Sequence, residues 1–302
     1  MGSQFKPETV REITSWNDFI KLESYYDSQR HKAEWVFRGH ASINLALETT
    51  LDRACKEFNI QGNDIELIER DLIIDFQRNY HLHSVTAPPE LEDTLEWLSL
   101  MRHHGTPTRL LDATFSLFIA VYFALENASG DAGIWAFNKS WLTEEYHKVV
   151  GAWDRKAAEG FPITRSGRLY ESIFMQGQRF RLIVPVSPLR LNQRFSIQQG
   201  SFLCPGDVTR TFEQNLMGMD SSAANVEFLA ARAKSRFEIL RKLHRAGINR
   251  SLLFPGLDGF ASSLRTKMLI LAQLNEMKKS GSRSPHNIER RFDSAGGADI
   301  VR

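Results

Sequence analysis

The sequence contains very little cysteine, and its two cysteines, Cys55 and Cys204, lie far apart along the chain. This pattern offers neither a disulfide framework nor the close ligand spacing of a zinc site. Such cysteine usage is typical of a reducing compartment. We therefore expect the protein in the cytoplasm, without a structural metal.

Long apolar runs are also missing. The longest, at residues 117–125, is well short of the ~18 residues that a membrane-spanning helix requires. The N-terminus lacks the apolar core of a signal peptide. Phosphate-binding glycine-rich loops of the Rossmann or P-loop kind are absent as well. We expect no membrane partner, and a nucleotide would have to be held by a different fold.

Charge is almost balanced, since 38 Lys and Arg face 36 Asp and Glu, which gives a formal net charge of +2 at pH 7. One window differs from this average. Between Arg155 and Arg194 there are eight basic and two acidic residues, a local charge of +6. A basic window favours an anionic ligand or a nucleic acid, but it is also compatible with a solvated surface that acids elsewhere in the fold balance.

The apolar fraction of 42% over 302 residues is sufficient for a sizeable core. The pattern predicts an α+β fold, with several helices packed on a central small mixed or antiparallel sheet. We expect a single domain over residues 1–278, a variable insertion at 139–178, a polar lead-in at 1–14 and a disordered tail at 279–302. Helices are predicted near 15–27, 64–80, 90–104, 115–125, 142–153, 235–244 and 262–277, and strands near 34–39, 133–137, 181–186, 191–195, 200–202 and 226–230.

The densest group of unusual residues runs from His103 to Thr114 and combines two histidines, an arginine, an aspartate, three threonines and a Gly/Pro break. It lies between two predicted helices, a position that can hold a ligand. His103, His104 and Arg109 are the candidates to face one. Asp112 is expected to be structural, either by capping the following helix or by pairing with Arg109.

Two further segments carry candidate binding groups. Arg38 and Gly39 end a predicted strand, where a planar guanidinium can take a phosphate or carboxylate and a glycine lets a ligand approach the backbone. An ordinary salt bridge at a strand end is the alternative. Gln198 and Gln199 can donate and accept hydrogen bonds together, which suits amide or ribose recognition, although solvated loop glutamines remain the simpler interpretation.

Four blocks follow one another along the chain, namely Val36–Gly39, His103–Asp112 with the Ala120–Ala124 helix, Arg194 with Gln198–Phe202, and Gly247–Ile248 with Leu253–Pro255 and Leu257–Gly259. In this order they resemble the FRG-domain family, which is named for a Phe/Tyr-Arg-Gly signature. The resemblance covers about residues 13–275. The chain departs from the family pattern at Arg102, His104, Ala113 and Gly256, where Gln, Tyr, Trp and Asp respectively are common.

The order of these blocks is similar to the layout of ADP-ribosyltransferases. That similarity implies NAD as a substrate held by Arg38 and a late carboxylate that stabilises charge on the ribose. Asp258 is the first choice for this catalytic acid and Glu227 the second. No Gln-x-Glu or Glu-x-Glu pattern occurs in the C-terminal half. The residues implied to contact NAD are Arg38, Gly39, His40, His103, His104, Arg109, Gln198, Gln199 and Gly200.

The implied function is a toxin or antiphage-defence effector, with nucleic acid as a candidate acceptor and an antitoxin-like protein as a candidate regulator. Two other classes stay open. One is a non-catalytic module that binds a ligand or nucleic acid, and the other is a metal-free nuclease built on His103, His104 and Asp112. The transferase hypothesis predicts that Arg38, Arg109, Gln199 and an acid line one cleft.

Overall fold

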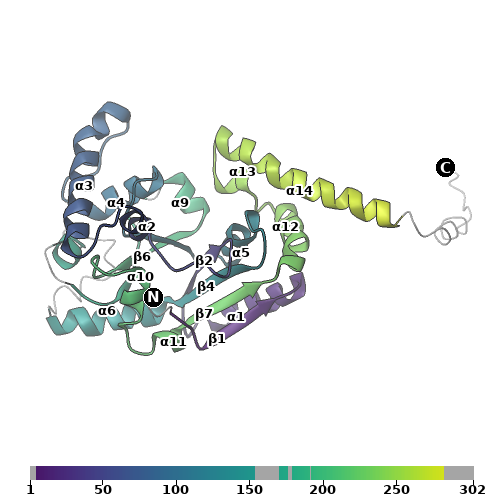
Figure 1. Cartoon of the computed structure of the whole chain (residues 1–302), viewed down its shortest axis with the longest axis horizontal. Helices are drawn as coiled ribbons and strands as arrows, with labels where there is room; N and C mark the ends of the chain where they lie inside the picture. Colours follow the sequence, from purple (N-terminus) through teal and green to yellow (C-terminus); the bar gives the residue numbers. More distant parts are fainter. Residues whose placement is uncertain (1–4, 154–169, 176–178, 191, 282–302) are drawn as a thin grey trace, which may run out of the picture.

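The computed structural model describes residues 5–153, 170–175, 179–190 and 192–281. Its centre is a seven-stranded mixed sheet with the strand order β1-β7-β4-β2-β3-β6-β5 (Figure 1). β1 and β7 run parallel, and the other neighbours are antiparallel. The α+β class is confirmed, with a larger sheet than predicted. The strands are β1 (Thr9–Ile13), β2 (Trp35–His40), β3 (Leu111–Thr114), β4 (Ala132–Asn138), β5 (Ile183–Val186), β6 (Gly200–Pro205) and β7 (Val226–Ala231).

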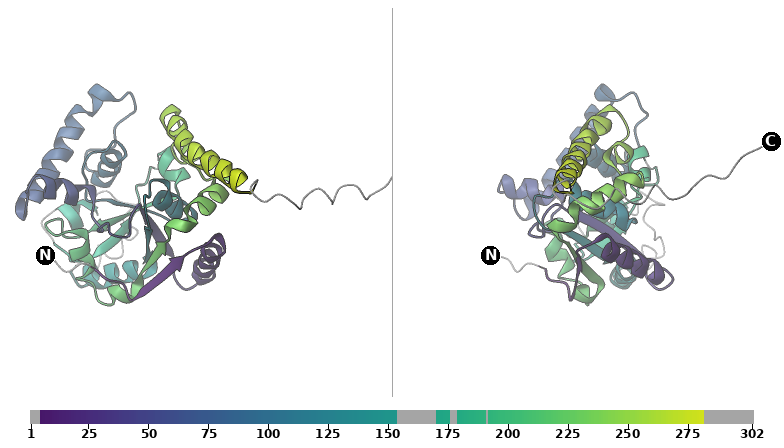
Figure 2. Two further views of the ribbon diagram at one scale, coloured as in Figure 1. Left: turned by 45° about the vertical axis from the view of Figure 1, so that its right-hand side comes forward. Right: turned by 90° about the vertical axis from the view of Figure 1, so that its right-hand side faces the viewer.

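Helices cover both faces of this sheet, so the core forms two layers (Figure 2). Apolar residues of α1, α5 and α12 pack on one face, and those of α3, α4, α6 and α10 pack on the other. The α-helices are α1 (Trp16–Gln29), α2 (Thr50–Glu57), α3 (Asn63–His83), α4 (Thr94–His103), α5 (Leu117–Glu126), α6 (Lys139–Trp153), α9 (Gln193–Ile197), α10 (Phe212–Leu216), α11 (Ser222–Asn225), α12 (Arg236–Arg245), α13 (Arg250–Leu253) and α14 (Leu257–Gly281). Two short helices of other types are η2 (Glu171–Met175) and η3 (Ala233–Ser235).

Edge strand β1 replaces part of the polar lead-in that the sequence predicted. It pairs in parallel with β7, with Ile13 opposite Ala231. Arg11 donates from Nε to Glu227 Oε2 at 2.8 Å across this pair. The prediction was wrong because the strand is largely polar and is stabilised by a partner more than 200 residues away, so its own residues carry little strand signal.

Helix α5 is buried over most of its surface, as its apolar sequence predicted. Its N-cap, however, is Ser116, whose hydroxyl accepts a hydrogen bond from the Ile119 amide at 3.4 Å. Asp112 and Thr114 belong to β3 instead. The prediction that Asp112 caps this helix is therefore wrong, because the chain continues extended for two residues beyond it.

The segment predicted as a strand at 191–195 is the short helix α9. Asn192 caps it by accepting a hydrogen bond from the Phe195 amide at 2.8 Å, a local contact that competes with extended structure. At the C-terminus, α14 is longer than the helix predicted at 262–277. Within the predicted insertion, residues 154–169 and 176–178 lie outside the described residues, as does the predicted tail from residue 282 onward.

Candidate functional site

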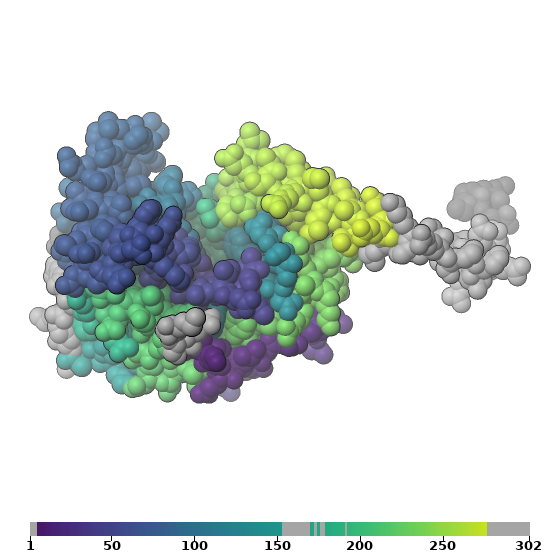
Figure 3. Space-filling model, viewed as in Figure 1, coloured from purple at the N-terminus to yellow at the C-terminus, as the bar shows by residue number. Residues whose placement is uncertain are grey.

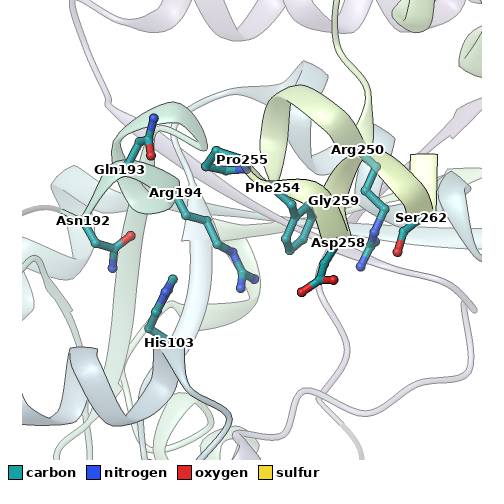
Figure 4. A pocket seen from close by; sticks show the side chains of 10 residues that line it. All are labelled: His103, Asn192, Gln193, Arg194, Arg250, Phe254, Pro255, Asp258, Gly259 and Ser262. Carbon is teal, nitrogen blue, oxygen red and sulfur yellow. The ribbon is translucent and has the colours of Figure 1, made fainter. Parts of the chain in front are cut away.

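Two adjoining cavities lie between the end of α4, the start of α9 and the segment that joins α13 to α14. We call them the outer cavity, of about 350 Å³, and the inner cavity, of about 200 Å³. Arg194 and Phe254 line both, so the cavities adjoin, and we refer to the two together as the cleft. In the space-filling view the surface is hollowed between α3 and the α13–α14 pair (Figure 3). The outer cavity is lined by His103, Asn192, Gln193, Arg194, Arg250, Phe254, Pro255, Asp258, Gly259 and Ser262 (Figure 4).

Arg38 lines the inner cavity, and its position follows from the way β2 and β3 separate. These strands pair at only one position, Phe37 opposite Thr114. Beyond it, Nη1 of Arg38 donates to the main-chain oxygen of Asp112 at 2.7 Å, in place of a strand amide. Burial, partly offset by the Asp112 carboxylate, lowers the pKa of Arg38 to about 10, so the guanidinium stays charged at neutral pH. The side chain is therefore fixed and cationic before any ligand arrives.

His40 holds the other side of the same guanidinium. Its Nε2 accepts a hydrogen bond from Nε of Arg38 at 2.9 Å, which requires Nε2 to be unprotonated. Burial and the positive charge of Arg38 lower the pKa of His40 to about 3. His40 does not line the cleft. The sequence implied a direct NAD contact for His40, but the structure gives it the role of orienting Arg38.

Asp112 lines the inner cavity beside Arg38 and pairs with Arg102 rather than Arg109. The Nε atom of Arg102 donates to Oδ2 of Asp112 at 3.0 Å. Nη1 of Arg38 is 3.8 Å from the same oxygen. The Asp112 side chain is nevertheless 47% exposed. The predicted Asp112–Arg109 pair is wrong because the two side chains leave the chain on different sides of the structure.

Arg109 is fully buried in a separate ion pair with Glu69 of α3. Its Nε donates to both carboxylate oxygens of Glu69, at 2.9 and 2.8 Å. Burial alone would lower the pKa of Arg109, but the charge and hydrogen bonds of Glu69 outweigh that effect and raise it. Only 1% of the Arg109 side chain is exposed. The prediction that Arg109 lines the same cleft as Arg38 is therefore wrong, because the Arg109 guanidinium is buried in the core and paired with Glu69.

Arg194 is a half-buried cation that lines both cavities of the cleft. Its guanidinium stacks over the Phe254 ring at 4.2 Å from the centroid. Across the described part of the chain it forms no salt bridge. Burial and the nearby positive charges of Arg102 and Arg250 lower the pKa of Arg194, against the raising effect of Asp112. A half-buried arginine without a carboxylate partner favours an anionic ligand.

Arg250 stacks on the same ring, at 4.3 Å from the Phe254 centroid, but it differs from Arg194 in having an acid partner. Its Nη1 donates to Oε2 of Glu126 at 2.8 Å. Glu126 also accepts a hydrogen bond from the Tyr122 hydroxyl at 2.9 Å. Arg250 therefore completes a structural network between α13 and α5, and Arg194 carries the net positive charge of the cleft wall.

Asp258 and His103 approach the outer cavity from opposite walls. Figure 4 shows the Asp258 carboxylate, the Arg194 guanidinium and the His103 ring directed toward the same space. Asp258 is exposed and has no salt bridge among the described residues. Partial burial, His104 and the charge of Arg194 lower the pKa of His103. His104 packs edge-on against His103, with ring centroids 4.9 Å apart, and does not line the cleft.

The glutamine pair is divided between two cavities. Gln198 lines the inner cavity, and its amide nitrogen donates to the Leu253 carbonyl at 2.9 Å, which holds the Gln198 side chain against α13. Gln199 adopts a positive φ of 47° and lines a different cavity of about 420 Å³, between α1 and the start of α5. The prediction that Gln199 shares a cleft with Arg38 is wrong because the αL residue reverses the side-chain direction.

Both predicted glycines serve packing. A Cβ on Gly39 would lie 2.1 Å from the Ala120 carbonyl oxygen, so glycine is required there by the approach of α5. Gly39 does line the inner cavity. A Cβ on Gly200 would lie 2.7 Å from the Phe195 ring, and Gly200 lines neither cavity of the cleft.

Glu227, the second candidate acid, lies in β7 and is buried away from the cleft. Besides Arg11, it accepts a hydrogen bond from the Tyr26 hydroxyl at 2.9 Å. This ion-pair network joins β1, β7 and α1. Asp258 is therefore the candidate acid that the structure brings to the cleft.

Sequence reasoning did not assign Arg194, Arg250 or Phe254 to the site, nor Arg102, which pairs with Asp112 beside it. Arg250 and Phe254 stand four residues apart, a spacing that allows stacking on a helical turn and could have drawn attention. Arg102 carried a weaker signal, as a departure from the family pattern. In the described part of the chain, there is no group of three or more His, Cys, Asp and Glu side chains that could hold a metal. No described helix has the length and apolarity to cross a membrane.

Comparison with known proteins adds one finding. Neither the curated proteins nor the solved structures contain a match to this chain. One family model, that of the FRG domain, matches residues 33–132. The matched segment extends from β2 to the start of β4, and therefore contains Arg38, His103 and Asp112 but not Arg194 or Asp258. This match supports the FRG family for the part of the chain that supplies one wall of the cleft.

Proposed function

We propose that this protein is an NAD-dependent ADP-ribosyltransferase that binds NAD in the cleft between Arg38 and Asp258. Arg109 and Gln199, which the hypothesis placed beside Arg38, lie elsewhere, so the proposal rests on a different observation. The cleft combines a pre-oriented arginine, Arg38, with Arg194 and Asp258, neither of which has a salt-bridge partner among the described residues. Such an arrangement binds an anion and keeps a separate negative charge for chemistry.

The composition of the cleft supports a dinucleotide. The two phosphates of NAD require cations, which Arg38 and Arg194 supply. The nicotinamide ring requires a small apolar space, and the inner cavity of about 200 Å³ has Phe37, Phe123 and Phe254 in its walls. Since the nitrogen of the Gln198 amide is already used, its oxygen is left to accept a hydrogen bond from the nicotinamide amide.

The proposed reaction breaks the bond between the ribose C1′ and the nicotinamide nitrogen. The bonding electron pair leaves with nicotinamide, and positive charge develops on the ribose. The carboxylate of Asp258 stabilises that charge. A nucleophilic oxygen or nitrogen of the acceptor then bonds to C1′, and its proton passes to the Asp258 carboxylate. Arg38 holds the substrate and takes no proton.

We retain nucleic acid as the proposed acceptor, and a toxin or defence effector with an antitoxin-like regulator as the proposed context. Because Arg194 is assigned to the NAD phosphates, support for an anionic acceptor comes from the basic window of the sequence, which carries a local charge of +6. No comparable observation favours a nuclease. His103 and Asp112 line different cavities, and Arg102 already engages the Asp112 carboxylate.

The test is incubation of the pure protein with NAD labelled in the adenylate, in the presence of cellular RNA, DNA or protein. We expect label on one acceptor class, with release of free nicotinamide. Arg38→Ala should abolish both signals, whereas Arg190→Ala, a surface change outside the cleft, should leave them intact. NAD binding without nicotinamide release would favour the binding module. RNA cleavage without NAD would favour the nuclease, and either result would reject the transferase.

A further inference from the structure

An exposed apolar stripe runs along one side of α14, the last helix that the structure describes. Its five members, which we call the α14 stripe, are between 43% and 78% exposed: Leu257, Phe260, Leu264, Met268 and Leu271. At about 100° per residue they fall within about 80° of one another around the helix axis. Large apolar side chains gathered in one line mark a contact surface more often than a solvated one.

The opposite side of α14 already has its partners. Ser263 and Thr266 are 8% and 6% exposed. A Cβ on Gly259 would lie 1.7 Å from the Phe254 carbonyl oxygen, so the start of the helix packs closely on the end of α13. Leu269 packs on the core cluster of α5 and α12. The helix is therefore anchored, and the exposed α14 stripe lies on the side away from these contacts. Figure 1 shows α14 at the edge of the body, next to α13.

The spacing of the stripe points to a particular partner. The intervals between successive members are three, four, four and three residues, so the stripe reads the same in both directions from Leu264. A two-fold axis at Leu264 would place Leu257 of one copy on Leu271 of the other, and Phe260 on Met268. An isologous dimer requires such a self-complementary surface, whereas an unrelated partner does not.

Charge favours the antiparallel arrangement over a parallel one. Lys267 flanks the stripe between Leu264 and Met268. Parallel helices in register would place Lys267 against its own copy. The antiparallel arrangement places it opposite Ala261, so like charges are kept apart. We propose that two copies of this chain form a symmetric dimer through antiparallel α14 helices, with the two-fold axis at Leu264.

The first test is the mass of the pure full-length chain by sedimentation equilibrium. We expect twice the 34.6 kDa of one chain. Leu264→Lys puts like charges on the axis and should raise the dimer dissociation constant by at least about 100-fold, as for a central hot spot. The melting temperature extrapolated to low protein concentration should stay unchanged, because Leu264 is exposed in the single chain. Leu67→Lys on α3 is the matched control, since Leu67 is 59% exposed elsewhere, and it should leave the dimer intact.

The second test fixes the register by oxidation of introduced cysteines, while the native Cys55 and Cys204 are buried. Leu264→Cys alone should cross-link to its own copy. Phe260→Cys alone should not, but Phe260→Cys combined with Met268→Cys should. A monomer at every concentration, or a dimer that tolerates Leu264→Lys, would overturn the proposal. Efficient cross-linking of Phe260→Cys alone would overturn the antiparallel register. These readouts use no NAD and are independent of the proposed enzyme activity.

Discussion

The Nε atom of Arg38 donates a hydrogen bond to Nε2 of His40 at 2.9 Å, so the charge of the arginine and the neutrality of the histidine depend on each other. Two residues apart on β2, they share one side of the strand. A protonated His40 would lose this acceptor and would place a second cation beside the guanidinium. The cleft therefore depends on a buried histidine that lies outside its walls.

This relationship predicts a pH dependence of stability. The pKa of folded His40 is lowered to about 3, so between that value and its ordinary pKa the unfolded chain binds the extra proton. The contribution of neutral His40 to the free energy of unfolding is thus fully present above about pH 6.5 and is lost as the pH falls. Between pH 7.5 and 5.0 the wild type should lose about 2 kcal/mol more unfolding free energy than His40→Gln. Urea unfolding of both proteins at both pH values measures the difference, and equal losses would contradict the buried neutral state.

The buried pair of Arg109 and Glu69 predicts a large stability effect without a binding effect. Arg109→Met leaves the Glu69 carboxylate without its partner, and should cost about 3–5 kcal/mol of unfolding free energy. Adding Glu69→Leu removes the unpaired buried carboxylate and should recover much of the lost unfolding free energy. Urea unfolding of the single and double variants tests this. If Arg109→Met unfolds like the wild type but fails to bind NAD, Arg109 must be reassigned to the ligand.

Arg194 and Arg190 allow a matched comparison of two arginines on one segment. Arg194→Gln removes the cation without an acid partner and should weaken NAD binding by at least about tenfold, with a shallower dependence on salt. Its stability should change by less than about 1 kcal/mol, since only the stacking on Phe254 is lost. Arg190→Gln should bind NAD normally. Calorimetric titration at two salt concentrations distinguishes them, and equal affinity of the two variants would remove Arg194 from the site.

Substitutions of the two candidate acids should have different effects, on the reaction rate for Asp258 and on stability for Glu227. Asp258→Asn should keep NAD affinity and stability, but lower the rate of nicotinamide release by at least about 100-fold. Glu227→Gln should instead lower stability by about 1–3 kcal/mol, because Arg11 and Tyr26 lose a charged acceptor. Single-turnover release and thermal unfolding give the two readouts. Full activity in Asp258→Asn would exclude this residue as the acid.

Replacing Gly39 should lower the stability of the protein because the site has no room for a side chain. In Gly39→Ala the new methyl group would meet the backbone of Ala120 and Ala124, at 2.1 and 2.7 Å, and backbone cannot move aside cheaply. We expect a loss of about 3 kcal/mol or more. Gly105→Ala is a useful control, because nothing surrounds that glycine and only its φ of 90° is strained. A Gly39→Ala protein as stable as the wild type would show that α5 can shift away from β2.

The sequence by itself determined the parts of this protein that depend on local pattern. Helix α5 was predicted from an apolar run, and β2 and β7 from short strand-forming segments between turns. Arg38 was singled out because a guanidinium at a strand end can take a phosphate or carboxylate, and the glycine after it lets a ligand approach the backbone. Local composition also excluded zinc spacing and glycine-rich phosphate loops. Such features are encoded within about ten neighbouring residues, so no distant contact is needed to see them.

Only the tertiary structure decided which charged side chains already have a partner within the protein. Arg38, Arg109 and Arg194 look alike in sequence. Yet Arg38 is oriented by His40, Arg109 is neutralised by Glu69, and Arg194 stacks on the Phe254 ring without an acid partner among the described residues. Glu227 was likewise assigned by partners remote in sequence, and Asp112 by Arg102 together with the distant Arg38. The strand at residues 9–13 needed β7 before it could be recognised. The physical reason is common to all of them: the role of an ionisable group depends on its burial and on the nearest opposite charge, and the fold sets both.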